Sequence, residues 1–462
     1  MMMTDNSPSP QRDDHADPFE RAARGQRVIR GAWILPNPTE RSLSARSDEI
    51  LLFDEEGIIL GLITPRMWSE RWPELSLPPL KRPGCWWTPG FIDTHVHYPQ
   101  THIIGSASGP LLDWLSTSVF PEEARFAHDE YATEVADYFC RAMLRQGTTS
   151  AAIFSSSHVS ATDLLFTSLE RHGMGAEVGL TLMDRGAPAD VLCPAEEALE
   201  GCERLIERWH QRASGRLKFC VTPRFGLSCT PALLRGAGLL AERHQLLMQT
   251  HISENKAELI ATAEAFPDAS DYLGVYEDFG LINERALLAH GIWLSESEWT
   301  RVADADVAIA HCPDSNFFLG SGAMSLSEAQ RRGVRVGLGS DVGAGRSFSM
   351  RRACARAYDA SRITQSPTTP SELFWLASRG GALALRRPDL GVIERGAHAD
   401  VICLEPPPRS PHTTSPQADL GDHTELASAE LDKLIARLIF SEDWDATREV
   451  YTRGEQRWSH QA

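Results

Sequence analysis

The stretch 90-GFIDTHVH-97 decides the fold that this sequence predicts. It is a short apolar run that ends in two histidines, His95 and His97, separated by one residue. In a β-strand, residues i and i+2 point to the same face, so both imidazoles can bind one metal ion from one side. This H-x-H pattern is weak evidence alone, and its weight depends on the sequence that follows.

Seven further short runs follow and alternate with longer amphipathic stretches. The apolar, β-branched runs lie at 147–157, 176–185, 216–225, 245–253, 286–292, 306–312 and 334–343. Helical patterns such as those at 130–147 and 196–213 separate them. Alternating strands and helices imply a parallel sheet. Eight such units predict an α/β fold, a (β/α)8 TIM-like barrel over residues 89–387.

The flanking segments have a different pattern. Short strand-like runs at both chain ends predict a small β-sandwich domain built from residues 26–88 and 388–462. The runs lie at 27–35, 49–64, 391–404 and 447–458. The polar residues 1–25 predict a disordered tail, and the Pro- and Ser-rich segment 405–423 predicts a mobile surface loop.

Composition excludes several classes of protein. The 462-residue chain has 42% hydrophobic and 23% charged residues, which is typical of an ordinary soluble globular protein and not of a disordered one. A net charge of −18 argues against binding to nucleic acids or anionic membranes. No run of about 18 apolar residues is present, so no transmembrane helix is expected. The nine widely spaced cysteines form no C-x-x-C pair, which favours reduced thiols and a cytoplasmic location.

Further candidate metal ligands stand at the ends of later predicted strands. His251 ends the fifth, His290 the sixth, and Asp341 the eighth. The carboxyl ends of barrel strands meet at one mouth, where active sites lie. We therefore expect these side chains to converge with His95 and His97. Three histidines and one carboxylate suit Zn²⁺ or Fe²⁺.

The sequence resembles the guanine deaminases of the metal-dependent amidohydrolase superfamily over nearly all of residues 26–458. The H-x-H pair is shared by the whole superfamily, whereas H-x-H-x-P-Q, T-P-R-F at 222–225 and H-I-S-E at 251–254 are typical of guanine deaminases. The segments that carry the resemblance are 89-PGFIDTHVHYPQTHIIGS-106, 111-LLDWLSTSVFPEEARF-126, 146-QGTTSAAIF-154, 222-TPRFGLSC-229, 250-THISEN-255, 289-AHG-291, 311-HCPDSNFFLGSG-322 and 339-GSDVGAGRSFSM-350.

The resemblance implies hydrolysis of guanine to xanthine and ammonia by a cytoplasmic homodimer, with neither nucleic acid nor membrane as a partner. It implies a proton-shuttle role for Glu254, a proton-accepting role for Asp341, and an orienting or stabilising role for His290. One ion, Zn²⁺ or Fe²⁺, would be bound by His95, His97, His251 and Asp341. The implied substrate contacts are His97, Gln100, Arg224, Phe225, His251, Glu254 and Asp341.

The chemistry of Arg224 and the position of Lys218 support two of these implications. An Arg224 guanidinium is a rigid donor fork that matches two adjacent acceptors such as guanine O6 and N7. Superfamily members with two metal ions bridge them with a carboxylated lysine at the end of the fourth strand. Here Lys218 lies four residues too early, which favours one ion.

Two alternatives stay open. A related enzyme acting on an oxidised guanine, a triazine or an adenosine derivative would have the same metal residues. A non-catalytic barrel is disfavoured because all ligands and Glu254 are present.

Several other motifs are weaker signals. His128-Asp129-Glu130 spells the H-x-E of another zinc deaminase fold, but it lacks the accompanying P-C-x-x-C and lies at a predicted helix start. His158 and His311 end the second and seventh strands and are further candidates for pocket residues. We expect packing roles for Trp86, Trp87 and Trp114, and surface or helical positions for His102, His172, His210 and His244.

Overall fold

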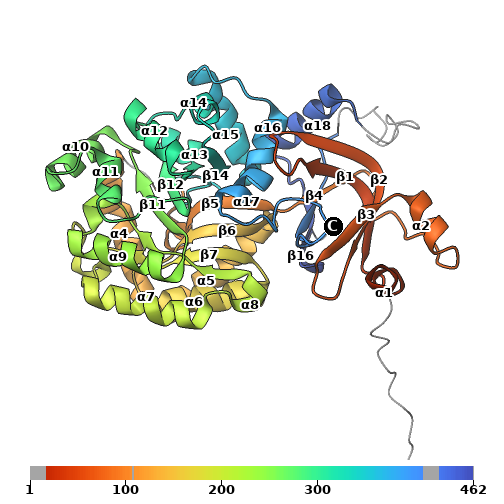
Figure 1. Ribbon diagram of the computed structural model, residues 1–462, viewed down its shortest axis with the longest axis horizontal. Coiled ribbons are helices and arrows are strands. Elements are labelled where there is room, and N and C mark those ends of the chain that lie inside the picture. Colours follow the sequence, from red (N-terminus) through yellow and green to blue (C-terminus); the bar gives the residue numbers. More distant parts are fainter. Residues whose placement is uncertain (1–16, 107–108, 409–425, 461–462) are drawn as a thin grey trace, which may run out of the picture.

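All eight predicted runs contain strands in the computed structural model, which describes residues 17–106, 109–408 and 426–460. The strands surround one axis, and helices cover their outer side (Figure 1). The predicted (β/α)8 barrel is therefore confirmed. Its strands are β5 (Phe91–His97), β6 (Thr148–Phe154), β7 (Gly175–Gly179) with β8 (Thr181–Leu182), β9 (Leu217–Phe219) with β10 (Thr222–Pro223), β11 (Met248–Ile252), β12 (Ala286–His290), β13 (Ala308–His311) and β14 (Arg335–Leu338).

Two seams join the two four-stranded halves of the barrel, β5-β6-β7-β9 and β11-β12-β13-β14. At the first seam, Val221 forms a parallel bridge with Met248. At the second, the Asp341 backbone N–H donates to the His95 carbonyl (2.8 Å), and the His97 N–H donates to the Val342 carbonyl (3.1 Å). The second seam places the residues after β14 beside the carboxyl end of β5.

Amphipathic helices cover the outer face of the strands. In α7, the buried residues Ala198, Cys202, Leu205 and Trp209 recur at helical spacing and face the barrel. Helix α5 begins at Asp129, so the H-x-E sequence lies at a helix start, as predicted. The larger helices are α5 (Asp129–Arg145), α6 (Val159–His172), α7 (Ala195–Trp209), α9 (Pro231–His244), α10 (Lys256–Ala265), α12 (Glu296–Asp304) and α15 (Met350–Ile363).

Shorter helices occupy the loops after several strands. They follow β5, β11, β13 and β14 or lie between the longer helices, and one, at Arg212–Gly215, directly precedes β9. They are α3 (Leu111–Trp114), α4 (Phe120–Ala124), α8 (Arg212–Gly215), α11 (Tyr272–Glu277), α13 (Pro313–Phe318), α14 (Leu326–Arg331), α16 (Pro370–Trp375) and α17 (Gly381–Ala384).

The two chain ends form one seven-stranded sheet beside the barrel, on the right of Figure 1. Its strand order is β17-β16-β15-β4-β1-β2-β3, and the central pair, β4 and β15, joins the N-terminal part to the C-terminal part. Trp86 and Trp87 of β4 are buried on opposite faces of this sheet, as their predicted packing role requires. The strands are β1 (Val28–Pro36), β2 (Leu43–Phe53), β3 (Ile59–Ile63), β4 (Trp86–Pro89), β15 (Val401–Leu404), β16 (Thr447–Thr452) and β17 (Glu455–Ser459).

The predicted disordered tail is wrong for its last part, because Pro18–Arg24 forms helix α1. The Asp17 side chain accepts a hydrogen bond from the Phe19 N–H at 3.1 Å and caps the helix. Ala22 and Ala23 are buried in a cluster with Trp68 of α2 (Pro65–Arg71). Residues 1–16 lie outside the described part of the chain, as do residues 409–423 of the predicted Pro-rich loop. Helix α18 (Ser428–Phe440) follows that segment.

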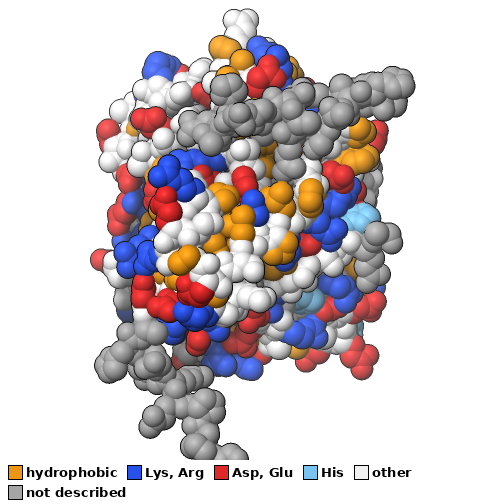
Figure 2. All heavy atoms as spheres, turned by 90° about the vertical axis from the view of Figure 1, so that its right-hand side faces the viewer, with side chains coloured by type: hydrophobic (Ala, Val, Ile, Leu, Met, Phe, Trp, Pro, Cys, Tyr) orange, Lys and Arg blue, Asp and Glu red, His pale blue; other side chains and the backbone are white. Residues whose placement is uncertain are grey.

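The charges on the surface are mixed, and the cysteines are unpaired, as the sequence predicts for reduced thiols. Lys and Arg side chains are interspersed with Asp and Glu on the face shown in Figure 2. All nine cysteines are free thiols. None of the helices in the described part of the chain combines the length and apolar character needed to cross a membrane.

A buried ion pair connects the barrel to the sheet. Arg216 precedes β9, and Asp400 precedes β15. Two guanidinium nitrogens of Arg216 lie 3.0 Å from the two Asp400 carboxylate oxygens, and both side chains are buried (7% and 3% exposed). Asp400 also accepts the Arg453 backbone N–H at 2.8 Å.

We expect Asp400→Asn to lower the free energy of unfolding by about 3 kcal/mol, because Arg216 would remain buried without a counter-charge. Urea denaturation followed by circular dichroism measures this change. Glu70→Gln is the control: it removes the partner of Arg66 in an exposed pair (85% and 61% exposed) and should change stability by less than about 0.5 kcal/mol. Equal effects of the two substitutions would contradict this role of the buried pair.

Candidate functional site

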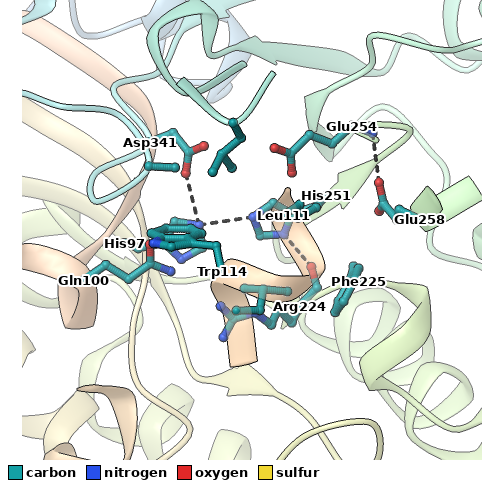
Figure 3. A pocket seen from close by; sticks show the side chains of 13 residues that line it. His97, Gln100, Leu111, Trp114, Arg224, Phe225, His251, Glu254, Glu258 and Asp341 are labelled. Carbon is teal, nitrogen blue, oxygen red and sulfur yellow. Dashed lines mark hydrogen bonds and ion pairs between the residues drawn. The ribbon is translucent and has the colours of Figure 1, made fainter. Parts of the chain in front are cut away.

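Four side chains from three parts of the barrel, those of His95, His97, His251 and Asp341, meet at its mouth, and Figure 3 shows the last three of them. His97 Nε2 lies 3.2 Å from His95 Nε2 and 3.1 Å from His251 Nε2. One carboxylate oxygen of Asp341 lies 3.3 Å from His95 Nε2 and 3.4 Å from His97 Nε2. The convergence expected from the strand ends is therefore present.

These separations fit ligands of a single metal ion. Two atoms that each lie about 2.05 Å from a tetrahedral zinc ion are about 3.3 Å apart. The His97 Nε2 atom faces two other ring nitrogens at once, and one proton cannot serve both contacts. Three nitrogens and a carboxylate oxygen are also the donor types that Zn²⁺ and Fe²⁺ prefer. The group is thus able to hold a divalent metal ion.

The protonation of the group suits metal binding. Burial lowers the pKa of His95, and burial together with the neighbouring imidazoles holds the pKa of His97 and His251 well below the ordinary value. Burial alone would raise the pKa of Asp341, but the surrounding imidazoles outweigh it and lower that pKa. Neutral imidazoles and an ionised carboxylate are the forms that bind metals.

Neighbouring groups fix the orientation of the ligands. His251 Nδ1 lies 2.6 Å from the Arg224 carbonyl oxygen, so its Nε2 is left facing the other ligands. A carboxylate oxygen of Asp93 accepts the backbone N–H groups of His95 (3.2 Å) and Ser340 (2.9 Å), across the second seam. Asp341 adopts a φ of +49°, a strained conformation for a non-glycine residue.

Glu254 and His290 lie beside this cluster, and a ring nitrogen of His290 is within 4.8 Å of ring nitrogens of His95 and His251. A Glu254 carboxylate oxygen is 3.4 Å from His290 Nε2, and the Ser321 hydroxyl donates to the other oxygen at 3.3 Å. Burial raises the pKa of Glu254 to about 7, despite the opposing effect of His290. Burial would lower the pKa of His290, but the Glu254 and Asp341 carboxylates outweigh it and raise that pKa. Glu254 is thus suited to exchange a proton near neutral pH.

Two further contacts hold these groups in place. His290 Nδ1 is 2.8 Å from the Asn316 side-chain oxygen, and His290 Nε2 is 3.8 Å from Asp341. A Glu258 carboxylate oxygen accepts the Glu254 backbone N–H at 3.0 Å, and this fixes the loop after β11.

Gln100, Arg224 and Phe225 line the same cavity, as the resemblance implied. In Figure 3 Gln100 lies beside His97, Arg224 lies below His251, and Phe225 lies on the right, on the side of Glu258. Trp114 is buried, as predicted for a packing residue, but it is also part of the cavity wall. Glu258 also lines the cavity, and the apolar part of the wall consists of Leu111, Leu115, Leu319 and Ala344.

Sequence reasoning missed several supporting residues. Asp93, Glu123, Asn316 and Ser321 all lie inside the segments that carry the resemblance, but no spacing rule identifies their partners. The candidates His158 and His311 do not line the cavity. The buried His158 Nε2 and both His311 ring nitrogens have no hydrogen-bond partner among the described residues.

Comparison with known proteins assigns the class of this barrel. The chain belongs to the amidohydrolase family, whose model matches residues 86–439. It is 34% identical to the guanine deaminase of Escherichia coli K12 over 430 residues, which is 90% of this chain and 94% of that protein.

Solved structures agree. Guanine deaminase from Bradyrhizobium japonicum superposes with a TM-score of 0.86 at 30% identity, over 94% of this chain and 99% of that one. Guanine deaminase from C. acetobutylicum, solved with guanine bound in the active site, superposes with a TM-score of 0.81 at 27% identity, over 93% and 99%. The predicted resemblance is confirmed.

We expect His251→Ala to abolish retention of the metal ion, because it removes one of three clustered nitrogens. Elemental analysis of purified protein measures this loss. His244→Ala is the control: this half-buried histidine pairs with Glu203 on the outer side of the barrel, so the variant should keep its metal. A His251→Ala protein with the wild-type metal content would exclude His251 as a ligand.

Proposed function

We propose that this protein hydrolyses guanine to xanthine and ammonia. The observation that carries the proposal is the Glu254 carboxyl group, which lines the same cavity as His97, His251 and Asp341 of the metal-ligand cluster. The cavity is also lined by Gln100, Arg224 and Phe225. Hydrolytic deamination of a heterocycle needs an activated water on one side of the ring and a proton donor for the ring nitrogen and the leaving amine.

His95, His97, His251 and Asp341 would hold the ion, which we propose is zinc, with Fe²⁺ as the alternative. When bound, such an ion lowers the pKa of a water molecule to about 7 and so makes hydroxide available at neutral pH. The proposal of one ion per chain is supported by Lys218. This lysine lies 3.9 Å from Glu177 on the neighbouring strand, away from the cavity.

Two residues would transfer protons, and a third would orient the attacking group. Asp341 accepts the proton of the attacking water. Glu254, protonated at the start, delivers its proton to the ring nitrogen as the water oxygen bonds to the ring carbon. It then takes the remaining proton from that oxygen, which becomes the carbonyl of xanthine, and passes it to the amine, so that the C–N bond breaks and ammonia leaves. The proton held by Asp341 returns to Glu254 and restores the starting state. One Glu254 oxygen accepts a hydrogen bond from Ser321, which directs the shuttled proton to the oxygen that faces His290. His290, fixed by Asn316, orients the hydroxide.

Three other residues that line the cavity would hold the purine. Arg224 and Gln100 supply donors toward its carbonyl and ring acceptors, and Phe225 packs on the heterocycle. The remaining substrate contacts would come from His97, His251, Glu254 and Asp341, which surround the reacting carbon. The homodimer and the cytoplasmic location stay predictions.

We expect Glu254→Gln to reduce kcat by about 10²–10⁴-fold, because the amide has the same shape but cannot carry the proton. Steady-state assays of ammonia release measure this loss, and metal content should not change. Glu264→Gln, an exposed position on α10, should retain full activity. A loss below tenfold for Glu254→Gln would assign the shuttle to Asp341 or His290.

We expect guanine to be deaminated and adenine to be nearly inert. Adenine presents a donor where guanine presents O6, so the Arg224 fork would face an unmatched group in a closed cavity. Polar mismatches of this kind discriminate by about 10⁴–10⁵-fold. A spectrophotometric comparison of the two purines measures the ratio, and comparable turnover of both would refute the role of Arg224.

The same contact predicts that Arg224→Ala lowers kcat/KM for guanine by at least about 100-fold, since a charge-assisted hydrogen bond and its unpaired acceptor are both affected. Arg235→Ala, an exposed position on α9, is the matched control and should have wild-type kinetics. An active Arg224→Ala enzyme would require a different binding mode.

A further inference from the structure

One buried carboxylate joins two of the side chains that line the cavity without lining it itself. Glu123, on α4, is 2% exposed. One of its oxygens lies 2.6 Å from a guanidinium nitrogen of Arg224, and its other oxygen accepts the Gln100 side-chain N–H at 3.3 Å. Arg224 and Gln100 are themselves buried (3% and 2% exposed), so these contacts lie away from bulk water.

Glu123 determines how Gln100 presents its amide. The Gln100 side-chain oxygen accepts the Gly343 backbone N–H at 3.1 Å, while its nitrogen donates to Glu123. The amide therefore has one orientation. One N–H of Gln100 and the rest of the Arg224 fork are left for a ligand.

Glu123 also balances charge. An unpaired guanidinium in a closed cavity attracts anions strongly, because the interior screens charges poorly. With Glu123 at 2.6 Å, Arg224 offers directed donors while the pair carries no net charge. A neutral purine is suited to such a wall. The product xanthine is more acidic than guanine and becomes an anion as the pH rises, and this wall does not favour it.

We propose that Glu123 is a positioning and specificity-determining residue that acts through Arg224 and Gln100. It orients their donors toward a neutral oxopurine and prevents Arg224 from retaining the anionic product. The inference rests on the proposed function, since it concerns the guanine side of the same cavity.

Glu123→Gln tests the proposal. The amide that replaces the carboxylate supplies one acceptor oxygen instead of two, and its N–H group faces a donor. Arg224 stays charged but loses its counter-charge. We expect KM for guanine to rise at least tenfold with kcat changed less than threefold, because the contact exists in ground and transition states alike. At pH 8.5 the inhibition constant of xanthine for this variant should equal that of the wild type or lie below it. A substitution that only loosens the fold would raise KM for guanine and the inhibition constant of xanthine together, and that result would overturn the proposal.

Glu122→Gln is the matched control. Glu122 is the neighbouring carboxylate on α4, but it contacts Arg125 and Tyr131 instead of the cavity residues. We expect unchanged kinetics for this variant. In an Arg224→Ala background, the effect of Glu123→Gln on kcat/KM should shrink at least fivefold, since most of it acts through Arg224. Full additivity of the two substitutions would contradict that route.

Arg224→Gln gives an independent test if Glu123→Gln fails to fold. It leaves the Glu123 charge uncompensated, so xanthine affinity should fall more between pH 6.5 and 8.5 than in the wild type. An unchanged pH dependence would overturn the proposal. Calorimetric titration with guanine and xanthine measures binding directly. A wild-type enzyme without guanine turnover would refute the proposed function, whereas the binding data would still test Glu123.

Discussion

The site depends on the backbone hydrogen bonds that close the barrel between β5 and the residues after β14. Asp341 donates its N–H to the carbonyl of His95, and His97 donates its N–H to Val342. Backbone groups of the proposed metal ligands His95, His97 and Asp341 thus take part in closing the barrel. Asp93 strengthens the seam by accepting backbone N–H groups from both sides. A shift of this seam by one residue would move Asp341 away from the two imidazoles.

The sheet built from the two chain ends holds the start of β5 and so supports this seam. Strand β4 continues into β5 through Gly90, whose N–H donates to the Asp400 carbonyl at 3.0 Å. A Cβ atom at Gly90 would lie 2.1 Å from the Thr149 hydroxyl oxygen, so a larger residue does not fit. Asp400 is also the partner of Arg216. The strand that carries His95 and His97 is therefore held at both ends.

Charge balance is the second constraint on the cavity. Three buried carboxylates at the cavity have a charged or imidazole partner: Asp341 has the imidazoles, Glu254 has His290, and Glu123 has Arg224. Unpaired charges at these depths would be costly. The pairing leaves one wall suited to proton exchange and the other suited to a neutral ligand with hydrogen-bond acceptors.

The sequence by itself determined the eight-strand alternation and the convergence of His95, His97, His251, His290 and Asp341. Both follow from local periodicity and from the parallel topology, which brings strand ends together whatever the loops do. Only the tertiary structure decided that Glu123 supports Arg224 and Gln100, that Asn316 holds His290, that Trp114 forms part of the wall, and that Pro18–Arg24 folds as a helix against the sheet. These contacts join segments distant in the chain, and their partners are selected by packing and burial, which no short-range pattern encodes.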